Sequence, residues 1–523
     1  MLIYPSATFS TWSPVIRIAS RRDLKTILAV TNSVTKSKEL AKNSSILSTQ
    51  NDLVVFDMEW THPWLPITYE TQNQMLEAIS KEKLDDLFCN IPDKFRLKRD
   101  LKLPTSHSEY EVAKRLQELA SKNHPADNGR VFIGSGVYPH YIPHVVPALA
   151  GRSEFVTSYT SYQPEISQGM LQTLFEYQSM LAEILQIEVV NSSMYDMATA
   201  LGEAARMTAR VNKKRDRFLI PSSMNPEFCK VLQTYTEPAD IEVEQIDYDK
   251  NTGLMDLSDL ESRLNEDVAG VYLENPSYLG FIETQVDAIS KMAHDAGALL
   301  VAGVDILSLG LLRPPGEYGA DIVIAEGQPL GSPMSYGGPL LGIFGCKMER
   351  KLVYQMPGRL VGLTRTEEEP YERGYVLTLS PREQHIRREK ATSNICSNQA
   401  LAAVTAAVYL STIGPTGLYE LSKSIAYKSN YVAKKLNEIS GVVSPAIGDS
   451  IWREFVVQFN DGVSAEDVHD ALLANNLHGG KILSTVFPEL GESMLLCVTE
   501  LHDLQTIEEL IETISGIFQN GGA

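Results

Sequence analysis

A tyrosine-rich segment that precedes one of the long predicted helices contains residues that could do chemistry. Tyr159, Tyr162, Gln163 and Glu165 lie just before a helix that we expect to begin near Ser167. Tyrosines beside a carboxylate can stack on an aromatic cofactor and orient a polar substrate. Tyrosine is also enriched at protein interfaces, so the same residues could form a subunit contact. The sequence leaves both interpretations open.

A second candidate is the loop at residues 325–341, which contains the consecutive glycines Gly337 and Gly338 and three prolines. This composition fixes a non-repetitive backbone, which lets main-chain N–H groups closely approach a ligand or a facing subunit. A tight loop with only a structural role has the same composition, so this interpretation also stays open.

Two further segments could bind an anion. Residues 191–195 lead from an apolar strand into an alanine-rich helix, and a helix N-terminus with serine hydroxyls favours anions. Ordinary capping of the helix explains the serines Ser192 and Ser193 equally well. The other segment packs basic residues closely together in an acidic chain: Arg382, His385, Arg387, Arg388 and Lys390. They could hold a carboxylate or phosphate, or lie on a solvated helix face or at a subunit contact.

Other classes of site have little support in the sequence. The histidines form no HExxH pair and the five cysteines form no CxxC, so we expect no metal site and no disulfide framework. The chain has no GxxxxGK[ST] motif and no complete Rossmann fingerprint. Its net charge of −20 argues against binding to nucleic acid or to anionic membranes. No window approaches the length of a membrane-spanning apolar run, so we expect no membrane segment.

Short apolar runs alternate with helical segments through the centre of the chain. The runs that we predict as strands are residues 216–223, 241–247, 268–277, 298–305, 321–327 and 340–345. Such alternation is typical of an α/β fold with a large parallel or mixed sheet covered on both faces. These sheets bind ligands at the carboxyl ends of their strands, so the loops after residues 305 and 327 are the first places to look for a site.

The 523 residues are too many for one compact core, and their pattern predicts four parts. Residues 1–57 are rich in Ser and Thr and have no acidic residue before Asp23, which suits a transit peptide, a tail or a start assigned too early, with the true start near Met58. The other predicted parts are a helical arm at 58–150, a large α/β domain at 151–415 and a small α+β domain at 416–523. The last shows a β-α-β-β-α pattern.

Four long stretches, in order, resemble one known family. They are residues 162–178, 191–205, 325–339 and 382–401. Together they are similar to the P-protein family of the glycine cleavage system, in particular to subunit 1 of its two-subunit form, from about Trp64 to the C-terminus. The resemblance implies the type I fold of pyridoxal phosphate-dependent enzymes, which is aspartate-aminotransferase-like with a large and a small domain.

The resemblance also implies two changes at the cofactor site. In the catalytic half of the family, a lysine that forms a Schiff base precedes a glycine-rich run. An ungapped match aligns Pro333 and residues 337–339 with that run and places Gln328 at the lysine position. An amide cannot form an imine. The aspartate expected at the pyridinium nitrogen falls at or near Gly303, and Asp305 lies two residues on, on the same face of the strand.

These changes imply a glycine decarboxylase made of two kinds of subunit. Subunit 2 would supply pyridoxal 5'-phosphate and its lysine, and this chain would complete that site across the interface. The residues expected to face the partner's cofactor are Tyr159, Tyr162, Gln163, Glu165 and Tyr336. Glycine would lose carbon dioxide, and its aminomethyl group would pass to the lipoyl arm of the H-protein, in a complex with the T- and L-proteins. The expected compartment is the cytoplasm, or the mitochondrion if residues 1–57 are a transit peptide.

Two alternatives remain at this point. The chain could be a self-sufficient pyridoxal phosphate enzyme that uses Lys347 or Lys351, although both follow the strand at 340–345 instead of preceding it. It could also be a non-catalytic scaffold that docks other proteins through its acidic surface.

Overall fold

The computed structural model describes residues 68–158 and 161–520, and the chain divides into two compact units between His107 and Ser108. The prediction on residues 1–57 therefore lies outside the described residues, and the predicted domain ranges stay predictions.

In the first unit, helix α2 (Tyr69–Ala78) begins after Thr68, whose hydroxyl oxygen accepts a hydrogen bond from the N–H of Thr71. Two short 3-10 turns follow, at Leu84–Phe88 and Asp93–Phe95. The regular helix of this unit therefore ends at Ala78, and 3-10 turns follow it.

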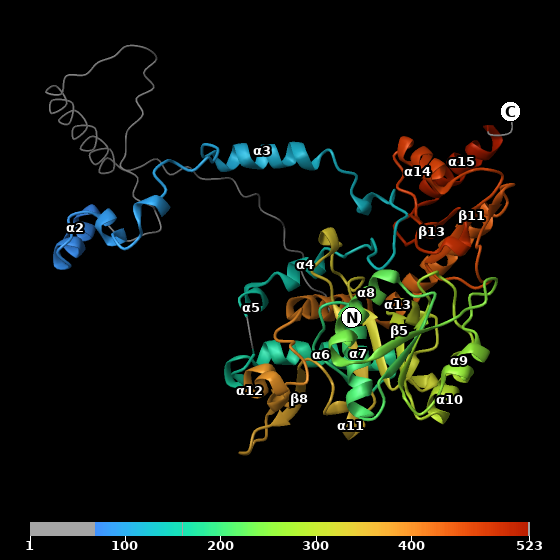
Figure 1. Cartoon of the computed structure of the whole chain (residues 1–523), viewed down its shortest axis with the longest axis horizontal. Coiled ribbons are helices and arrows are strands. Elements are labelled where there is room, and N and C mark those ends of the chain that lie inside the picture. The colour runs from blue at the N-terminus through green and yellow to red at the C-terminus, as the bar shows by residue number, and fades with distance from the viewer. Residues whose placement is uncertain (1–67, 159–160, 521–523) are drawn as a thin grey trace, which may run out of the picture. The chain divides into compact units, whose positions relative to one another are not determined.

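A seven-stranded mixed sheet forms the centre of the second unit (Figure 1). Its strands lie in the order β1-β7-β6-β5-β4-β2-β3. They are β1 (Val189–Val190), β2 (Arg217–Pro221), β3 (Glu242–Ile246), β4 (Val268–Asn275), β5 (Leu299–Asp305), β6 (Ile322–Glu326) and β7 (Gly342–Cys346). Strands β2 to β6 are parallel, whereas β7 is antiparallel to both β6 and β1. The apolar runs predicted as strands are confirmed as β2 to β7.

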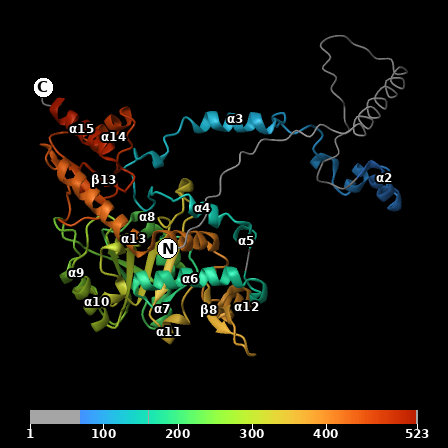
Figure 2. The same cartoon turned by 180° about the vertical axis from the view of Figure 1, so that it is seen from behind.

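Helices cover both faces of this sheet (Figure 2). The first face packs against α6 (Gln168–Leu185), α9 (Leu257–Arg263), α10 (Val286–Asp295) and α13 (Ala400–Leu436). The second face packs against α7 (Met197–Val211), α8 (Pro226–Thr236) and α11 (Arg350–Val353). Strand β5 shows the alternation: Leu300, Ala302 and Val304 belong to the first core, and Leu299 and Val301 belong to the second. Gly303 and Asp305 therefore share the second face.

Asp196 caps helix α7, and its carboxylate accepts a hydrogen bond of 2.7 Å from the N–H of Thr199. The serines that the sequence offered as caps bond elsewhere. Ser192 donates through its hydroxyl to the carbonyl of Arg359 (2.9 Å), and the hydroxyl of Ser193 accepts a main-chain N–H from the segment before α13. The interpretation of these serines as helix caps is wrong, because the carboxylate next to the first turn takes that position.

Among the described residues, α13 is the one helix long and apolar enough, by length and composition, to cross a membrane. It departs from helical geometry at Gly414, where φ is 61°, and Pro415 follows. Many of its buried side chains, such as Val404 and Ile425, belong to the core on the first face of the sheet, and it packs against α6. The described contacts of α13 are therefore those of a core helix.

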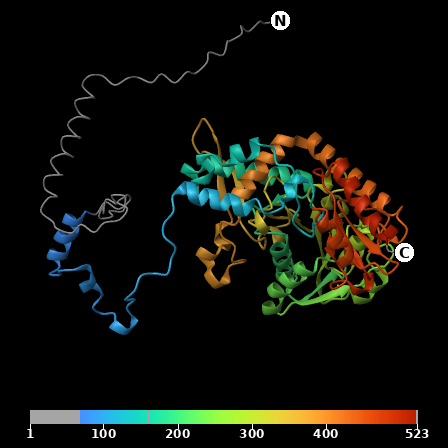
Figure 3. The same ribbon diagram turned by 90° about the horizontal axis from the view of Figure 1, so that it is seen from above.

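A smaller, four-stranded antiparallel sheet has the order β10-β11-β13-β12. It comprises β10 (Val442–Val443), β11 (Glu454–Phe459), β12 (Lys481–Ile482) and β13 (Ser493–Cys497), with helices α14 (Ala465–Ala474) and α15 (Leu504–Asn520). These elements, drawn in orange and red, gather at one side of the larger sheet (Figure 3). Ser464 and Asp467 cap α14 reciprocally. The predicted β-α-β-β-α pattern is confirmed.

The remaining elements of the second unit lie outside the seven-stranded and the four-stranded sheet. They are α3 (Glu109–Ala120), α4 (Val145–Ala150), α5 (Ser153–Val156), α12 (Gln384–Arg387) and a hairpin of β8 (Leu360–Arg365) and β9 (Arg373–Thr378). Ser108 and Glu111 cap α3 reciprocally. The hairpin was not predicted.

Candidate functional site

The carboxyl ends of β4, β5 and β6 border a cavity of about 60 Å³. These strands contribute Glu274, Asp305 and Glu326 to its lining. The lining also includes Arg453 and Glu454, at the start of the small sheet, and Tyr138, from residues 130–144, which we call the crossing segment. The cavity therefore lies where open α/β sheets bind their ligands.

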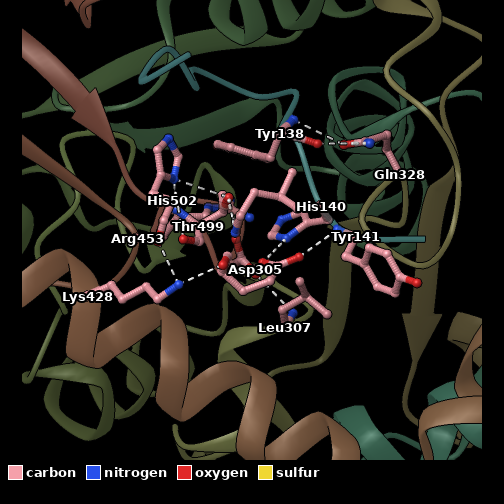
Figure 4. Close-up of polar contacts among 12 residues, drawn as sticks. Tyr138, His140, Tyr141, Asp305, Leu307, Gln328, Lys428, Arg453, Thr499 and His502 are labelled. Atoms are coloured by element: carbon pink, nitrogen blue, oxygen red, sulfur yellow. Dashed lines mark hydrogen bonds and ion pairs between the residues drawn. The ribbon is translucent and has the colours of Figure 1, made fainter. Parts of the chain in front are cut away.

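Gln328 is buried beside this cavity, and its side chain is held by the main chain of Tyr138 (Figure 4). The carbonyl oxygen of the Gln328 amide accepts a hydrogen bond from the N–H of Tyr138, and its NH₂ donates to the carbonyl of Tyr138, both at 3.1 Å. The NH₂ also donates to the carbonyl of Ser332 at 2.8 Å. Gln328 thus fixes the crossing segment to the loop that follows β6.

Replacing Gln328 by leucine should lower the free energy of unfolding by about 2 kcal/mol, because a buried N–H and a buried carbonyl of Tyr138 would lose their partner. Urea denaturation of the full chain measures this loss. Gln172→Leu is the matched control, since Gln172 is exposed on α6 and bonds only Glu176. Equal stability of the two variants would contradict the role assigned to Gln328.

Asp305 forms a buried ion pair with Arg453, whose guanidinium carbon lies 3.2 Å from the centre of the Tyr138 ring (Figure 4). The hydroxyl of Tyr138 donates to the carboxylate of Glu454 at 2.7 Å. Gly303 has no room for a side chain, because a Cβ there would lie 2.1 Å from the hydroxyl of Tyr272. Asp305, and not position 303, therefore presents the carboxylate at this end of β5.

The crossing segment is tied to the small sheet at several points. The N–H of Phe132 donates to the carbonyl of His478, and the carbonyl of Phe132 accepts from the N–H of Cys497, both at 2.8 Å. Farther along, His140 Nδ1 lies 2.8 Å from a carboxylate oxygen of Glu500. These contacts join the small sheet to the end of the large one.

Two of the cavity's carboxyl groups have strongly shifted pKa values. Burial raises the pKa of Glu274 to about 7, although the N–H of Tyr278 donates to its carboxylate. Burial also raises the pKa of Glu326 to about 8 against the opposing effect of main-chain N–H donors that include Leu341. Titratable groups with shifted pKa values that share one pocket are typical of a functional site, or of a pocket that descends from one.

A second cluster lies near the β8–β9 hairpin. Arg359 is buried and pairs with Glu383, with Nε and Oε2 3.1 Å apart. Its guanidinium also donates to the hydroxyl of Tyr162 and lies over the Tyr162 ring, 4.6 Å from the centre. The Tyr162 ring contacts the ring of His385, with centres 5.3 Å apart. A buried ion pair thus supports two half-exposed rings that other molecules can reach.

Cys396 lies beside this cluster. Burial raises the pKa of its thiol, but the hydrogen bond from Ser397 and the charge of Arg359 lower it by more. The pKa of the Cys396 thiol is therefore below its ordinary value. Its sulfur lies 3.6 Å from Nη2 of Arg359.

Comparison with known proteins decides the family. The family model described as glycine cleavage system P-protein matches residues 62–514. This chain belongs to the glycine cleavage system P-protein family. The "probable glycine dehydrogenase (decarboxylating) subunit 1" of Staphylothermus marinus is 45% identical over 87% of this chain and 98% of that protein. The protein of the same name from Thermococcus onnurineus is 46% identical over 85% of this chain and 97% of its own length.

Solved structures agree with the fold expected for a P-protein. An inhibitor-bound glycine decarboxylase (P-protein) matches with a TM-score of 0.77 and 37% identity, over 87% of this chain and 99% of that one. The sphingosine-1-phosphate lyase of Burkholderia pseudomallei matches with a TM-score of 0.59 at 14% identity, over 82% of this chain and 94% of that one, and so supports the fold alone. The fold is the type I fold of pyridoxal phosphate-dependent enzymes, as expected.

The residues at the carboxyl ends of the strands in this P-protein chain do not fit pyridoxal phosphate. Gln328 offers an amide whose polar atoms are already bonded to the main chain. The cavity of about 60 Å³ is several times smaller than the roughly 300 Å³ at which cofactor pockets begin. Arg453 pairs with the carboxylate of Asp305 and stacks on Tyr138.

The structure places the residues singled out in the sequence at different points of this P-protein chain. Tyr162 belongs to the Arg359 cluster, whereas Gln163, Glu165 and Tyr336 are exposed, and Tyr159 lies outside the described residues. Within the basic run, Arg382 is buried and donates to main-chain carbonyls, one of them that of Gly358 at 3.2 Å. Arg382 therefore has a structural role, which the run of basic residues did not indicate.

Lys347 lies at the opposite end of the sheet from the cavity. Its ammonium group pairs with Asp321, which precedes β6, at 2.7 Å, and donates to the carbonyl of Gly319. Lys351, exposed on helix α11, pairs with Glu349 at 3.2 Å. Neither lysine borders the cavity, which argues against a self-sufficient enzyme that uses one of them.

Sequence reasoning missed Arg359, Tyr138, Arg453 and Glu454. Tyr138 and Arg453 lie 315 positions apart in the sequence, so no local spacing could join them. A signal for Arg359 existed in principle, since it stands between a proline-glycine turn and the apolar pair Leu360 and Val361, where a buried arginine needs a partner.

Proposed function

We propose that this chain is subunit 1 of a two-subunit glycine decarboxylase and that a second subunit carries pyridoxal 5'-phosphate on its own lysine. Together the subunits would decarboxylate glycine and transfer the aminomethyl group to the lipoyl arm of the H-protein, alongside the T- and L-proteins. One observation carries the division of labour: the position expected for the Schiff-base lysine holds Gln328, bonded to the main chain of Tyr138. The chain therefore needs a partner for chemistry that requires an amine.

The Tyr162 cluster supports the proposal that this chain contributes to the partner's site. Tyr162 is 46% exposed, and its hydroxyl and ring are both fixed by Arg359. A fixed, exposed tyrosine can bind a substrate or cofactor without losing much side-chain freedom. We propose that Tyr162 faces the partner's cofactor, together with Gln163 and Glu165 of the same segment and Tyr336 of the loop after β6. Tyr159 belongs to the same segment of the sequence and is included on that ground alone.

We further propose the cytoplasm as the compartment. The support is the similarity to relatives from archaea, together with a family-model match that begins at residue 62, after the segment that could be a transit peptide.

The Schiff-base prediction is tested with the full chain alone. Mixed with pyridoxal 5'-phosphate and reduced with borohydride, the chain should acquire no covalent adduct, whereas the co-expressed pair should carry one on the second subunit. Mass spectrometry of the separated subunits reads this directly. An adduct on this chain at any lysine, with glycine turned over in the absence of a partner, would sink the proposal.

Tyr162→Phe should lower glycine–bicarbonate exchange by the complex about tenfold, because Arg359 would lose the hydroxyl that orients the ring. Gel filtration should show the complex still formed. Glu165→Ala should act in the same direction, since we place its carboxylate at the same interface.

Tyr419→Phe is the matched control for Tyr162→Phe, because Tyr419 is also 46% exposed but lies on α13. It should leave exchange unchanged. Exchange that is normal in both tyrosine variants, with the complex intact, would favour the alternative of a scaffold that only docks partners.

A further inference from the structure

The second half of α13 carries a line of charged and aromatic side chains that are at least partly exposed. The line consists of Glu420, Lys423, Tyr427, Tyr431 and Lys434. Spacings of three or four residues place these side chains along one side of the helix. The opposite side, which includes Ile425 and Val432, is buried. We call the exposed side the Tyr427 face, since Tyr427 at its centre is 73% exposed.

Two tyrosines at the centre of the Tyr427 face are arranged to bind another protein. The rings of Tyr427 and Tyr431 stack on each other, with centres 6.5 Å apart and planes 17° apart. Tyrosine is enriched at protein interfaces, because its ring buries a large area and has few torsions to fix. A ring already held by its neighbour on a helix loses still less freedom on binding. The Tyr427 face is therefore a candidate docking surface.

The charges of the Tyr427 face restrict what can dock there. The whole chain has a net charge of −20, so most of its surface repels a second copy. The Tyr427 face instead carries one acidic residue, Glu420, and two lysines, Lys423 and Lys434. Lys423 lies 3.8 Å from Glu420, whereas Lys434 has no acidic partner among the described residues. This face therefore has a positive charge to offer, and it lacks the acidic excess of the rest of the chain.

The order of the charges along the helix makes the Tyr427 face complementary to itself. Two copies that meet about a twofold axis use the same surface, so that surface must match its own reverse. In an antiparallel pair of α13 helices centred on Tyr427, Lys434 and Glu420 of opposite copies lie level, since each is seven residues from the centre. Lys423 and Tyr431 of opposite copies also lie level, each four residues from the centre. The first pair joins opposite charges, and the second joins an ammonium group and a ring.

We propose that the Tyr427 face of α13 binds a second copy of this chain, with the two helices antiparallel and the twofold axis at Tyr427. The acidic partner that Lys434 lacks within its own chain would then be Glu420 of the other copy. The proposal goes beyond the proposed function, because it joins two identical chains and involves neither a second kind of subunit nor a cofactor.

Sedimentation velocity of the full chain alone, over a range of concentrations, tests this proposal. We expect an equilibrium between one and two chains. Tyr427→Glu should raise the dissociation constant at least about a hundredfold, because both copies lose the central ring and two carboxylates meet at the axis. Tyr110→Glu is the matched control, since Tyr110 is 77% exposed on helix α3, and its dissociation constant should equal that of the wild type. A wild type that stays monomeric, or a Tyr427→Glu variant that associates like the wild type, would overturn the proposal.

An exchange of charges between copies tests the antiparallel arrangement. Glu420→Lys and Lys434→Glu each replace two attractive pairs in the dimer by two repulsive ones, so each variant alone should associate about tenfold more weakly. An equal mixture of the two variants should recover the affinity of the wild type, because each copy then supplies the charge that the other has lost. Positions 420 and 434 lie roughly 21 Å apart along one helix, so this recovery cannot arise within a single chain. A mixture that associates no more tightly than either variant would overturn the arrangement.

Co-expression with a second subunit separates the two possible occupants of the Tyr427 face. The Tyr427→Glu chain should still bind the second subunit, and loss of that binding would assign the face to the second subunit and overturn the proposal. Thermal unfolding verifies that each variant folds like the wild type. Because the sedimentation assays contain only this chain, their outcome is independent of the exchange assay that tests the proposed function.

Discussion

Replacing Arg453 by methionine should lower the free energy of unfolding by about 3–5 kcal/mol, because it leaves the carboxylate of Asp305 buried without its partner. Arg453 is 4% exposed and stacks on the Tyr138 ring, so water cannot replace the guanidinium. Methionine preserves much of the side-chain volume and, being unbranched at Cβ, adds little strain at a position whose φ is 63°. Urea denaturation of the full chain gives the difference.

Two comparisons separate the buried charge from a loss of packing. Arg313→Met removes an arginine from an ion pair with Asp287 that is 44% and 70% exposed, and it should cost less than about 1 kcal/mol. The double variant Arg453→Met/Asp305→Asn should be more stable than Arg453→Met alone, because the unpaired charge is gone. A double variant no more stable than the single one would show that the loss comes from packing.

The strands of the large sheet could be predicted because each is an apolar run bounded by turn residues, and burial on both faces requires such runs. The β8–β9 hairpin escaped prediction for the opposite reason. Its strands include Gly362, Arg365 and Arg373, and most of their residues are at least partly exposed, so no apolar pattern marks them. Exposed hairpins have a weaker signature in sequence than buried strands.

The candidate sites were predictable only where a local motif carried them. Gln328 was identified because a glycine-rich run fixed the register with a known family, and Tyr162 because it lies among other polar residues before a helix. Arg453 and Tyr138 meet through tertiary contacts between the crossing segment and the small sheet. The packing of the Asp305–Arg453 ion pair against Tyr138 could therefore not be predicted from sequence.

Glu274→Gln should remove a pH dependence of stability worth about 3 kcal/mol. In the folded chain, burial raises the pKa of Glu274 from 4.5 to about 7, so between these values the folded state holds one more proton than the unfolded state. The stability that Glu274 contributes is fully present below pH 4.5 and is lost as the pH rises through 7. Glutamine cannot titrate, and its amide can still accept the N–H of Tyr278 and donate to the hydroxyl of Tyr272.

Urea midpoints measured from pH 5 to pH 8 test this expectation. The wild type should lose more stability across this range than Glu274→Gln, and the two curves should separate most above pH 7. Glu176→Gln, on the exposed side of α6, is the control and should follow the wild type. Parallel curves for the wild type and Glu274→Gln would mean that the Glu274 carboxyl is already ionised at pH 5.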